Sequence, residues 1–191
     1  MTTPLPELAG AAGSLALVPA LERPDLLAEP VRAAVAALPA ADAARCGVAA
    51  IDPELADTAA FCEAYRSPLE LSANCVVVSG SRSGERRFAA CLVLATTRAD
   101  VNGVVRRRLD VRKASFAPTD EAVELTGMAF GGITPFGLPA GWSVLVDPAV
   151  LAAPAVVVGS GVRAGKLVVP GALLGDLPGA ESVEGLARPV A

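Results

Sequence analysis

The sequence predicts an α+β fold: a single domain with a curved mixed, mainly antiparallel β-sheet, partly closed into a barrel and flanked by helices. Three observations lead to this prediction. The 191 residues are 53% hydrophobic and 19% charged, as in one globular domain with a sizeable core. Short valine-rich runs bounded by Gly, Pro or Asp outnumber the segments with helical spacing. Those helical segments interrupt the strands without the regular alternation of a parallel α/β sheet.

The first part of the chain predicts an extension followed by the start of the domain. Residues 1–30 are rich in Pro, Ala, Gly and Leu, and we expect an extension that packs on the domain of residues 31–191. Helical spacing at 31–38 ends before a proline. Residues 47–51 predict a short strand, and Asp52-Pro53 predicts a turn. Residues 58–65 predict a helix with Asp57 or Thr58 as its N-cap.

The middle of the chain predicts a β-hairpin. Its strands are the apolar runs at 75–79 and 88–96, and the polar residues between them form the loop. Residues 100–109 predict a helix, because they begin at an acidic residue and end in arginines, as the helix dipole favours. Residues 111–116 predict a further short strand.

The last third predicts a helix, a long loop and more strands. The helix covers 118–125, with Thr119 as its cap and Gly127 just beyond its end. Strands are expected at 143–146, 155–159 and 166–169, and a short helix at 171–175.

The loop between them, residues 126–137, is the segment around which we expect the site to form. Four glycines and one proline rule out a central strand or a helix interior. Glycines let the backbone approach a ligand with exposed N–H groups, and the apolar side chains between them suit a pocket lining. An ordinary glycine-rich connection between a helix and a strand is the alternative. The apolar residues in question are Met128, Phe130, Ile133 and Phe136.

The composition excludes several kinds of chemistry. The chain has no histidine, which excludes Ser-His-Asp and Cys-His mechanisms and any His-ligated metal. The four cysteines form no CxxC pair and lie in apolar contexts, so we expect buried free thiols and a reducing cytoplasm. We expect no cofactor and no metal. No basic segment precedes the first apolar residues, and Asp147, Pro148 and Pro154 break the apolar region 144–162, so neither a secretory signal nor a membrane span is expected.

A basic segment stands out in a chain of net charge −4. A solvated helix face and a hairpin tip would explain it, and that is the commoner origin of such a run. A local phosphate-contacting surface is the functional alternative. No aromatic residue interleaves these cations, so base stacking is not indicated. The candidate contacts are Arg82, Arg86, Arg87, Arg106, Arg107, Arg108 and Lys113.

From about residue 51 to about residue 174 the chain resembles the YbaK/EbsC (ProX-like) family of aminoacyl-tRNA editing domains. Four groups of residues carry the resemblance. They are Asp52-Pro53 with Ala56-Asp57-Thr58; Ser72-Ala73-Asn74-Cys75-Val76-Val77-Val78; Thr126-Gly127 with Gly131-Gly132-Ile133-Thr134-Pro135-Phe136-Gly137; and Val144-Leu145-Val146-Asp147 with Val158-Gly159-Ser160-Gly161.

The resemblance implies a compact mixed α/β domain with a curved sheet. It also implies hydrolysis of the ester that joins a wrong amino acid to tRNA, by a free-standing enzyme, with tRNA-Pro as one candidate. The implied partners are the acceptor end of a mischarged tRNA and an aminoacyl-tRNA synthetase, with no membrane and no DNA. The implied substrate-binding residues are Thr126, Gly127, Met128, Gly131, Gly132, Ile133, Thr134, Pro135, Phe136, Gly137 and Gly159.

The chain departs from the family at Asn74, where the family usually places a lysine that supports binding and catalysis. Lys113 lies in a different segment and does not replace it. One hypothesis is a deacylase in which Asn74, Thr58 and Asp147 position the water or the substrate. The other is a binding module that keeps the pocket without the chemistry. Each residue also has a structural alternative: helix capping for Thr58, turn formation for Asp147, and a satisfied strand-start polar group for Asn74.

Overall fold

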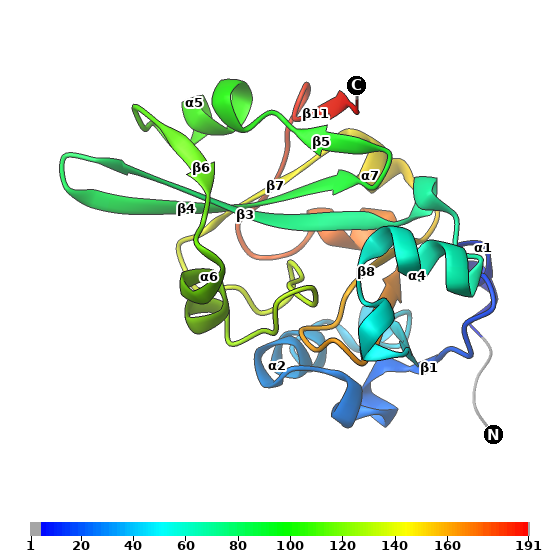
Figure 1. Ribbon diagram of the computed structural model, residues 1–191. Coiled ribbons are helices and arrows are strands. Elements are labelled where there is room, and N and C mark those ends of the chain that lie inside the picture. The colour runs from blue at the N-terminus through cyan, green and yellow to red at the C-terminus, as the bar shows by residue number, and fades with distance from the viewer. Residues whose placement is uncertain (1–4, 191) are drawn as a thin grey trace.

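The computed structural model describes residues 5–190, which form two main β-sheets with helices around them (Figure 1). The larger sheet has five strands in the order β10-β7-β4-β3-β6. Its β10–β7 and β7–β4 pairs are parallel, and its other pairs are antiparallel. The predicted mixed sheet is therefore confirmed. The strands are β3 (Ala73–Arg82), β4 (Glu85–Leu94), β6 (Ala114–Phe116), β7 (Ser143–Val146) and β10 (Ala180–Ser182).

The smaller sheet is antiparallel throughout, in the order β1-β2-β9-β8. Its strands are β1 (Val18–Pro19), β2 (Gly47–Ala50), β8 (Val156–Gly159) and β9 (Gly165–Val169). A separate two-stranded pair joins β5 (Thr97–Ala99) to β11 (Ala187–Pro189). The predicted hairpin is confirmed as the long β3–β4 pair, which reaches out to the left in Figure 1.

Neither sheet closes on itself within residues 5–190, so the predicted partly closed barrel is wrong. Among residues 5–190, the only backbone bridge between the two sheets is an isolated parallel one that joins Ser72 to Val157. Because one bridge cannot continue a hydrogen-bonded ladder, the sheets remain separate layers with their own edges.

The helices are short. The α-helices are α1 (Ala9–Ala12), α2 (Glu29–Ala36), α3 (Ala40–Ala43), α4 (Thr58–Tyr65), α5 (Arg106–Arg108), α6 (Thr119–Thr126) and α7 (Pro148–Ala152). The 3₁₀ turns are η1 (Pro6–Leu8), η2 (Ala20–Glu22), η3 (Pro24–Leu26), η4 (Pro53–Leu55), η5 (Leu69–Leu71) and η7 (Gly171–Gly175), and η6 (Val101–Val105) is a π-helical turn. None of these helices is both long and apolar enough to span a membrane.

Helix ends test the capping predictions. Asp57 caps α4, since its Oδ1 accepts hydrogen bonds from the N–H groups of Ala59 and Ala60. Gly127 ends α6 at a φ of 66°, which glycine adopts without strain. Thr119 is not the cap of α6: the cap position is Pro118, and Thr119 is already the first helical residue. Here the preceding proline, with its fixed extended geometry, sets the start of the helix.

Three apolar clusters hold the layers together. The largest lies between the two sheets and includes Val31 and Val35 of α2, and Phe136. A second covers the opposite face of the larger sheet beneath η6 and α5. A third packs Leu8 and Phe61 against the outer face of the smaller sheet. Residues 5–30 thus contribute to two clusters and add β1 to a sheet edge; the division at residue 30 stays a prediction.

Candidate functional site

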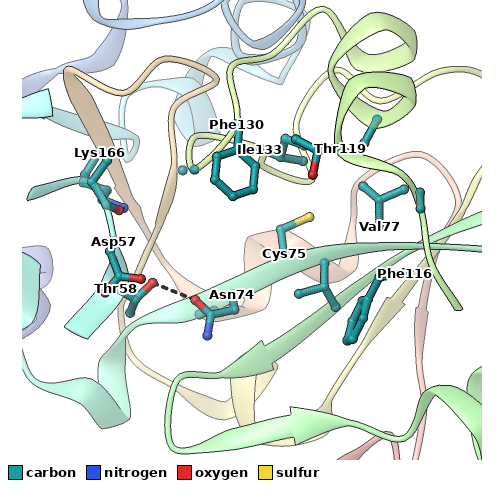
Figure 2. Close-up of a pocket in the computed structure, with 17 residues that line it drawn as sticks. Asp57, Thr58, Asn74, Cys75, Val77, Phe116, Thr119, Phe130, Ile133 and Lys166 are labelled. Atoms are coloured by element: carbon teal, nitrogen blue, oxygen red, sulfur yellow. Dashed lines mark hydrogen bonds between the residues drawn. The ribbon is translucent and has the colours of Figure 1, made fainter. Parts of the chain in front are cut away.

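A pocket of about 420 Å³ opens between the start of α4, the first half of β3, α6 and the glycine-rich loop. Figure 2 shows that it has two unlike sides. Lys166, Asp57, Thr58 and Asn74 lie along one side, whereas Phe130, Ile133, Cys75 and Val77 lie toward the other. The pocket therefore combines an apolar lining with a few grouped polar side chains, as small-molecule sites do.

The Thr58 and Asn74 side chains are joined directly. The Thr58 hydroxyl donates a 2.7 Å hydrogen bond to Asn74 Oδ1. Thr58 is placed by the first turn of α4, and Asn74 by the start of β3, where the hairpin pairs it with Val93. The bond orients the Asn74 amide, and its Nδ2 makes no hydrogen bond within the part of the chain that the structure describes. Nδ2 is thus available as a donor to a ligand.

Asp57 is the pocket's carboxylate. Its Oδ1 caps α4 at 3.0 Å from the Ala59 nitrogen. Its Oδ2 makes no hydrogen bond or ion pair among residues 5–190. That oxygen is therefore able to accept a proton or a hydrogen bond from a ligand or a water molecule.

Lys166 supplies a positive charge that the sequence analysis did not assign to the site. It lies on β9, is only 6% exposed, and its Nζ donates a 2.9 Å hydrogen bond to the Ala56 carbonyl. Nζ also lies 5.0 Å from the centre of the Phe61 ring. Burial lowers the pKa of its ammonium group. A lysine within a strand whose other side chains are apolar was the sequence signal for it.

The glycine-rich loop is fixed against the β8–β9 turn. The Ala129 N–H donates to the Gly161 carbonyl, and the Gly161 N–H donates to the Gly132 carbonyl, each at 2.8 Å. Arg163 adds hydrogen bonds to the carbonyls of Phe130 and Pro53, at 3.3 and 2.7 Å. These contacts hold the loop across the pocket from β3.

Only part of the loop reaches the pocket. Phe130, Gly131 and Ile133 line it, together with Gly159 at the end of β8. The Gly132 N–H donates to the Ala129 carbonyl at 2.9 Å and is not available to a ligand. The Gly131 N–H makes no hydrogen bond within residues 5–190.

The other predicted loop residues have structural surroundings. Met128 and Phe136 are buried in the main core. The Thr126 hydroxyl donates to the Ala122 carbonyl within α6, and the fully buried Thr134 hydroxyl has no partner among the described residues. Pro135 and Gly137 line a second, apolar pocket with Trp142.

Asp147 lies outside the pocket. It follows β7 and occupies the N-cap position of α7, next to a proline at the helix start. Burial raises the pKa of its carboxyl. The structure thus brings Thr58 and Asn74 together but places the third predicted catalytic residue elsewhere.

The thiols do not add a nucleophile. The four cysteines are free, as expected, and only Cys75 lines the pocket. Burial raises its pKa, which keeps the thiol protonated near neutral pH. Among residues 5–190 there is also no cluster of His, Cys, Asp or Glu that could hold a metal ion.

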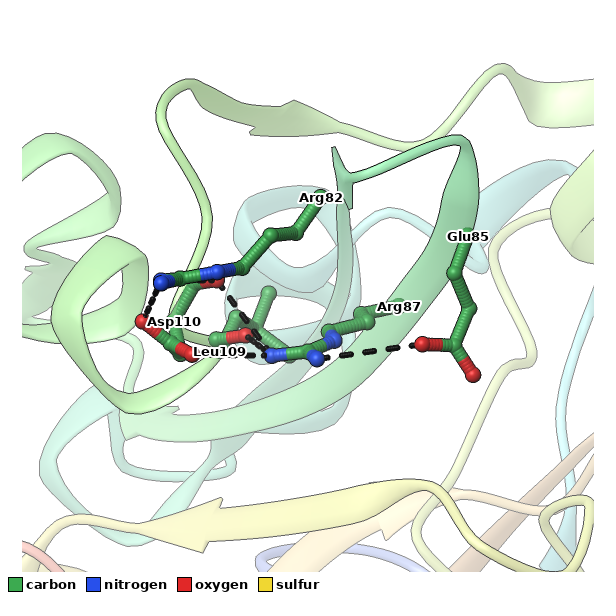
Figure 3. A network of polar contacts seen from close by, with 5 residues as sticks. All are labelled: Arg82, Glu85, Arg87, Leu109 and Asp110. Carbon is green, nitrogen blue, oxygen red and sulfur yellow. Dashed lines mark hydrogen bonds and ion pairs between the residues drawn. The ribbon is translucent and has the colours of Figure 1, made fainter.

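The basic segment is largely neutralised by acidic residues. Asp110 pairs with both Arg82 and Arg87, and Arg87 also reaches Glu85 (Figure 3). Arg86 pairs with Glu121, and Arg108 with Glu181. Within the described chain, the remaining candidate contacts make no ion pair; they are Arg106, Arg107 and Lys113.

Aromatic side chains nevertheless lie beside this segment. Phe88 stacks on Trp142 with ring centres 4.8 Å apart, and the Arg86 guanidinium lies 5.3 Å from the Phe88 ring centre. The expectation that no aromatic residue interleaves these arginines is wrong, because Phe88 directly follows Arg87 in the sequence and the fold brings in Trp142 from a distant loop.

Comparisons with known proteins agree with this architecture. No curated protein matches. The chain resembles the crystal structure of a candidate trans-editing enzyme for prolyl-tRNA synthetase with a TM-score of 0.67 and 21% identity, over 82% of this chain and 94% of the other. A scaffold protein for presenting linear epitopes matches with the same score and identity over 85% and 97% of the two chains. A hypothetical protein matches with a TM-score of 0.62 and 19% identity over 74% and 90%.

At these identities the structures support the fold. A family model, "Aminoacyl-tRNA editing domain", matches residues 52–177, which include the whole polar side of the pocket and the glycine-rich loop. This match covers most of the chain. The protein therefore belongs to the aminoacyl-tRNA editing domain family.

Proposed function

We propose that this protein is a trans-acting aminoacyl-tRNA deacylase, which hydrolyses the ester of a mischarged tRNA. One observation carries the proposal: three separate segments with the family's motifs converge on one pocket. Asp57 and Thr58 come from the first, Asn74 from the second, and Gly131 from the third. Membership of the editing family makes an aminoacyl-tRNA the expected ligand.

The pocket suits the terminal aminoacyl-adenosine of a tRNA in size and lining. Phe116 and Phe130 line it while remaining 64% and 63% exposed. Exposed aromatic faces next to a cavity stack with nucleic-acid bases. We assign the terminal adenine to this rim and the aminoacyl group to the interior, beside the polar side chains.

Hydrolysis requires a water molecule to add to the ester carbonyl carbon. The carbonyl oxygen then becomes negative, and collapse of the adduct breaks the bond to the ribose oxygen, which leaves as a hydroxyl after taking a proton. Asn74 Nδ2 and the Gly131 N–H are the unused donors that can stabilise the negative oxygen. The free oxygen of Asp57 can accept a hydrogen bond from the attacking water.

The first substrate that we propose is a mischarged tRNA-Pro. The structurally similar candidate trans-editing enzyme is described as acting for prolyl-tRNA synthetase. The unpaired cations Arg106, Arg107 and Lys113 are the ones we assign to phosphate contacts along the acceptor stem. Exposed pairs such as Arg82–Asp110 contribute little to stability, so those arginines can also exchange partners with a phosphate.

A second candidate function is a binding module that sequesters an aminoacyl-tRNA without turnover. The observation that favours it is the neutral Asn74, at the position where the family's usual lysine is expected from the resemblance. The two candidates differ in turnover and not in affinity.

A deacylation assay with a panel of mischarged tRNAs, beginning with Ala-tRNAPro and Cys-tRNAPro, tests the proposal. The matched variants are Asn74→Ala, which removes the whole amide, and Asn74→Asp, which keeps the acceptor for Thr58 but loses the donor. We expect both variants to lose activity. Tight binding of the aminoacyl-tRNA with no release of amino acid by the wild-type protein would favour the binding module.

A further inference from the structure

Lys166 is a buried charged residue on a strand whose other side chains are apolar. It is 6% exposed, and its neighbours along β9, Leu167, Val168 and Val169, are fully buried apolar residues. Across the ladder it pairs with Ala49 on one side and Gly159 on the other. These small neighbours leave room for a long side chain, which runs beside Gly159 to the pocket.

The buried charge is poorly compensated. No carboxylate lies within ion-pair distance of Nζ among residues 5–190, and its one hydrogen bond uses one of three N–H groups. An ammonium group taken out of water costs several kcal/mol unless a partner compensates it. Apart from the Phe61 ring at 5.0 Å, the remaining N–H groups have no partner among residues 5–190, at a point where the pocket gives a ligand access.

The groups around Lys166 define what it can attract. Asp57 lies on the same side of the pocket, and its negative charge favours the ammonium form of Lys166. The Arg163 guanidinium, which braces the glycine-rich loop, opposes it. Two cations thus lie near one partly engaged carboxylate, and a negatively charged oxygen of a ligand in the pocket would balance the charge of Lys166.

We propose that Lys166 is the anion-binding residue of the pocket, and that its ammonium group binds a negatively charged oxygen of the ligand. The identity of that ligand rests on the proposed function. For an aminoacyl-tRNA, the oxygen is either a phosphate oxygen of the terminal nucleotide or the ester carbonyl oxygen, which becomes negative during hydrolysis. The cation therefore comes from β9, on the other sheet from Asn74.

The composition allows a direct test, because the chain has only two lysines, Lys113 and Lys166. Protein labelled with ¹³C and ¹⁵N at lysine gives two side-chain NMR signals, which a Lys113→Arg variant assigns. The probes are AMP, inorganic phosphate, and a phosphate-free adenosine with an amide-linked alanine. We expect at least one probe to shift the Lys166 signal clearly further than the Lys113 signal.

The probes separate the two sources of the oxygen. A shift with AMP or phosphate assigns Lys166 to a phosphate, and a shift with the phosphate-free aminoacyl analogue alone assigns it to the carbonyl. Unchanged Lys166 signals with all three probes at saturating concentration overturn the proposal, as do equal shifts at both lysines.

Variants add a readout that a purely structural lysine would not give. We expect Lys166→Met to weaken binding of the effective probe by about tenfold or more, the loss of one charge-assisted hydrogen bond of about 1.5–3 kcal/mol. Lys166→Arg should restore part of the affinity, and Arg98→Met, which removes an exposed cation of β5 outside the pocket, should leave it unchanged. Thermal unfolding checks that each variant is folded; binding by folded Lys166→Met equal to that of the wild type overturns the proposal. Probe binding without any deacylation would leave Lys166 as the anion site and remove the proposed hydrolase.

Discussion

The Thr58–Asn74 hydrogen bond offers the sharpest test of the proposed chemistry, because one change removes it without altering shape. Thr58→Val replaces the hydroxyl by a methyl group of similar size and deletes the donor to Asn74 Oδ1 at 2.7 Å. The bond is partly buried, so its loss should lower the free energy of unfolding by about 0.5–1.5 kcal/mol. For a chain of this size, that corresponds to a decrease in Tm of about 2–4 °C per kcal/mol.

The effect on the rate depends on what Asn74 does. If Nδ2 stabilises the developing negative oxygen, Asn74→Ala should lower kcat by about 10²–10³-fold, as loss of an oxyanion donor does elsewhere. Thr58→Val keeps the Nδ2 donor but removes the hydrogen bond that orients the Asn74 amide. We therefore expect a loss of about fivefold to tenfold, corresponding to about 1–1.4 kcal/mol of positioning.

A double-mutant cycle with single-turnover deacylation measures the coupling. If Thr58 acts only through Asn74, adding Thr58→Val to Asn74→Ala should change the rate no further. Asn74→Asp is the matched control, since it retains the bond from Thr58 and should keep Tm near that of the wild type while losing activity. Additive losses in the double variant would refute the positioning role and would mean that Thr58 contacts the substrate or water by itself.

Four further changes test other parts of the site. Gly159→Ala would place a Cβ 2.7 Å from the carbonyl carbon of Gly132, so we expect a displaced loop and lower activity. Chemical denaturation should show a free energy of unfolding lower by about 1–3 kcal/mol. The control Gly10→Ala, whose Cβ would have nothing within 4 Å, should not destabilise the protein. Thr134→Val should leave Tm unchanged or raise it, because the buried hydroxyl has no described partner to lose. Asp147→Asn should leave kcat unchanged, and a marked decrease would restore Asp147 to the mechanism. The pKa of Lys166 is lowered in the folded state, so the unfolded chain binds more protons at this residue. The contribution of Lys166 to the free energy of unfolding therefore rises with pH up to the ordinary lysine pKa of about 10.4. Subtracting the pH–stability curve of Lys166→Met from that of the wild type should isolate this slope.

Local patterns predicted most of the elements. The hairpin, α4 with its Asp57 cap, and the glycine that ends α6 were all predicted because each depends on neighbours in sequence. The partly closed barrel was not a local property. Closure depends on whether edge strands from distant parts of the chain pair, and among residues 5–190 the only bridge between the two sheets joins Ser72, just before β3, to Val157 of β8. Short strands such as β10 and β11 were missed because they have little apolar patterning and form only by pairing with β7 and β5.

Some residues of the candidate site could likewise be predicted from the sequence, and others could not. The motif residues Thr58, Asn74 and Gly131 could be predicted, but the resemblance also suggested Asp147, Met128 and Phe136, which the fold uses for a helix start and for the core. A motif preserves residues that shape a pocket as well as those that line it, and sequence does not separate the two. Burial in the folded chain makes that distinction.

The position of the positive charge shows why the absence of a family residue is weak evidence about function. Asn74 leaves the pocket without a cation only when β3 is considered alone. The pocket is formed by both sheets, so a cation from β9 reaches the same volume as a side chain from β3. An electrostatic requirement belongs to a region of space, and any strand bordering that region can meet it. The neutral Asn74 is therefore an argument for the binding module only if Lys166 proves unable to bind an anion. The lysine NMR titration measures that binding, and the deacylation assay then decides whether the bound aminoacyl-tRNA is hydrolysed.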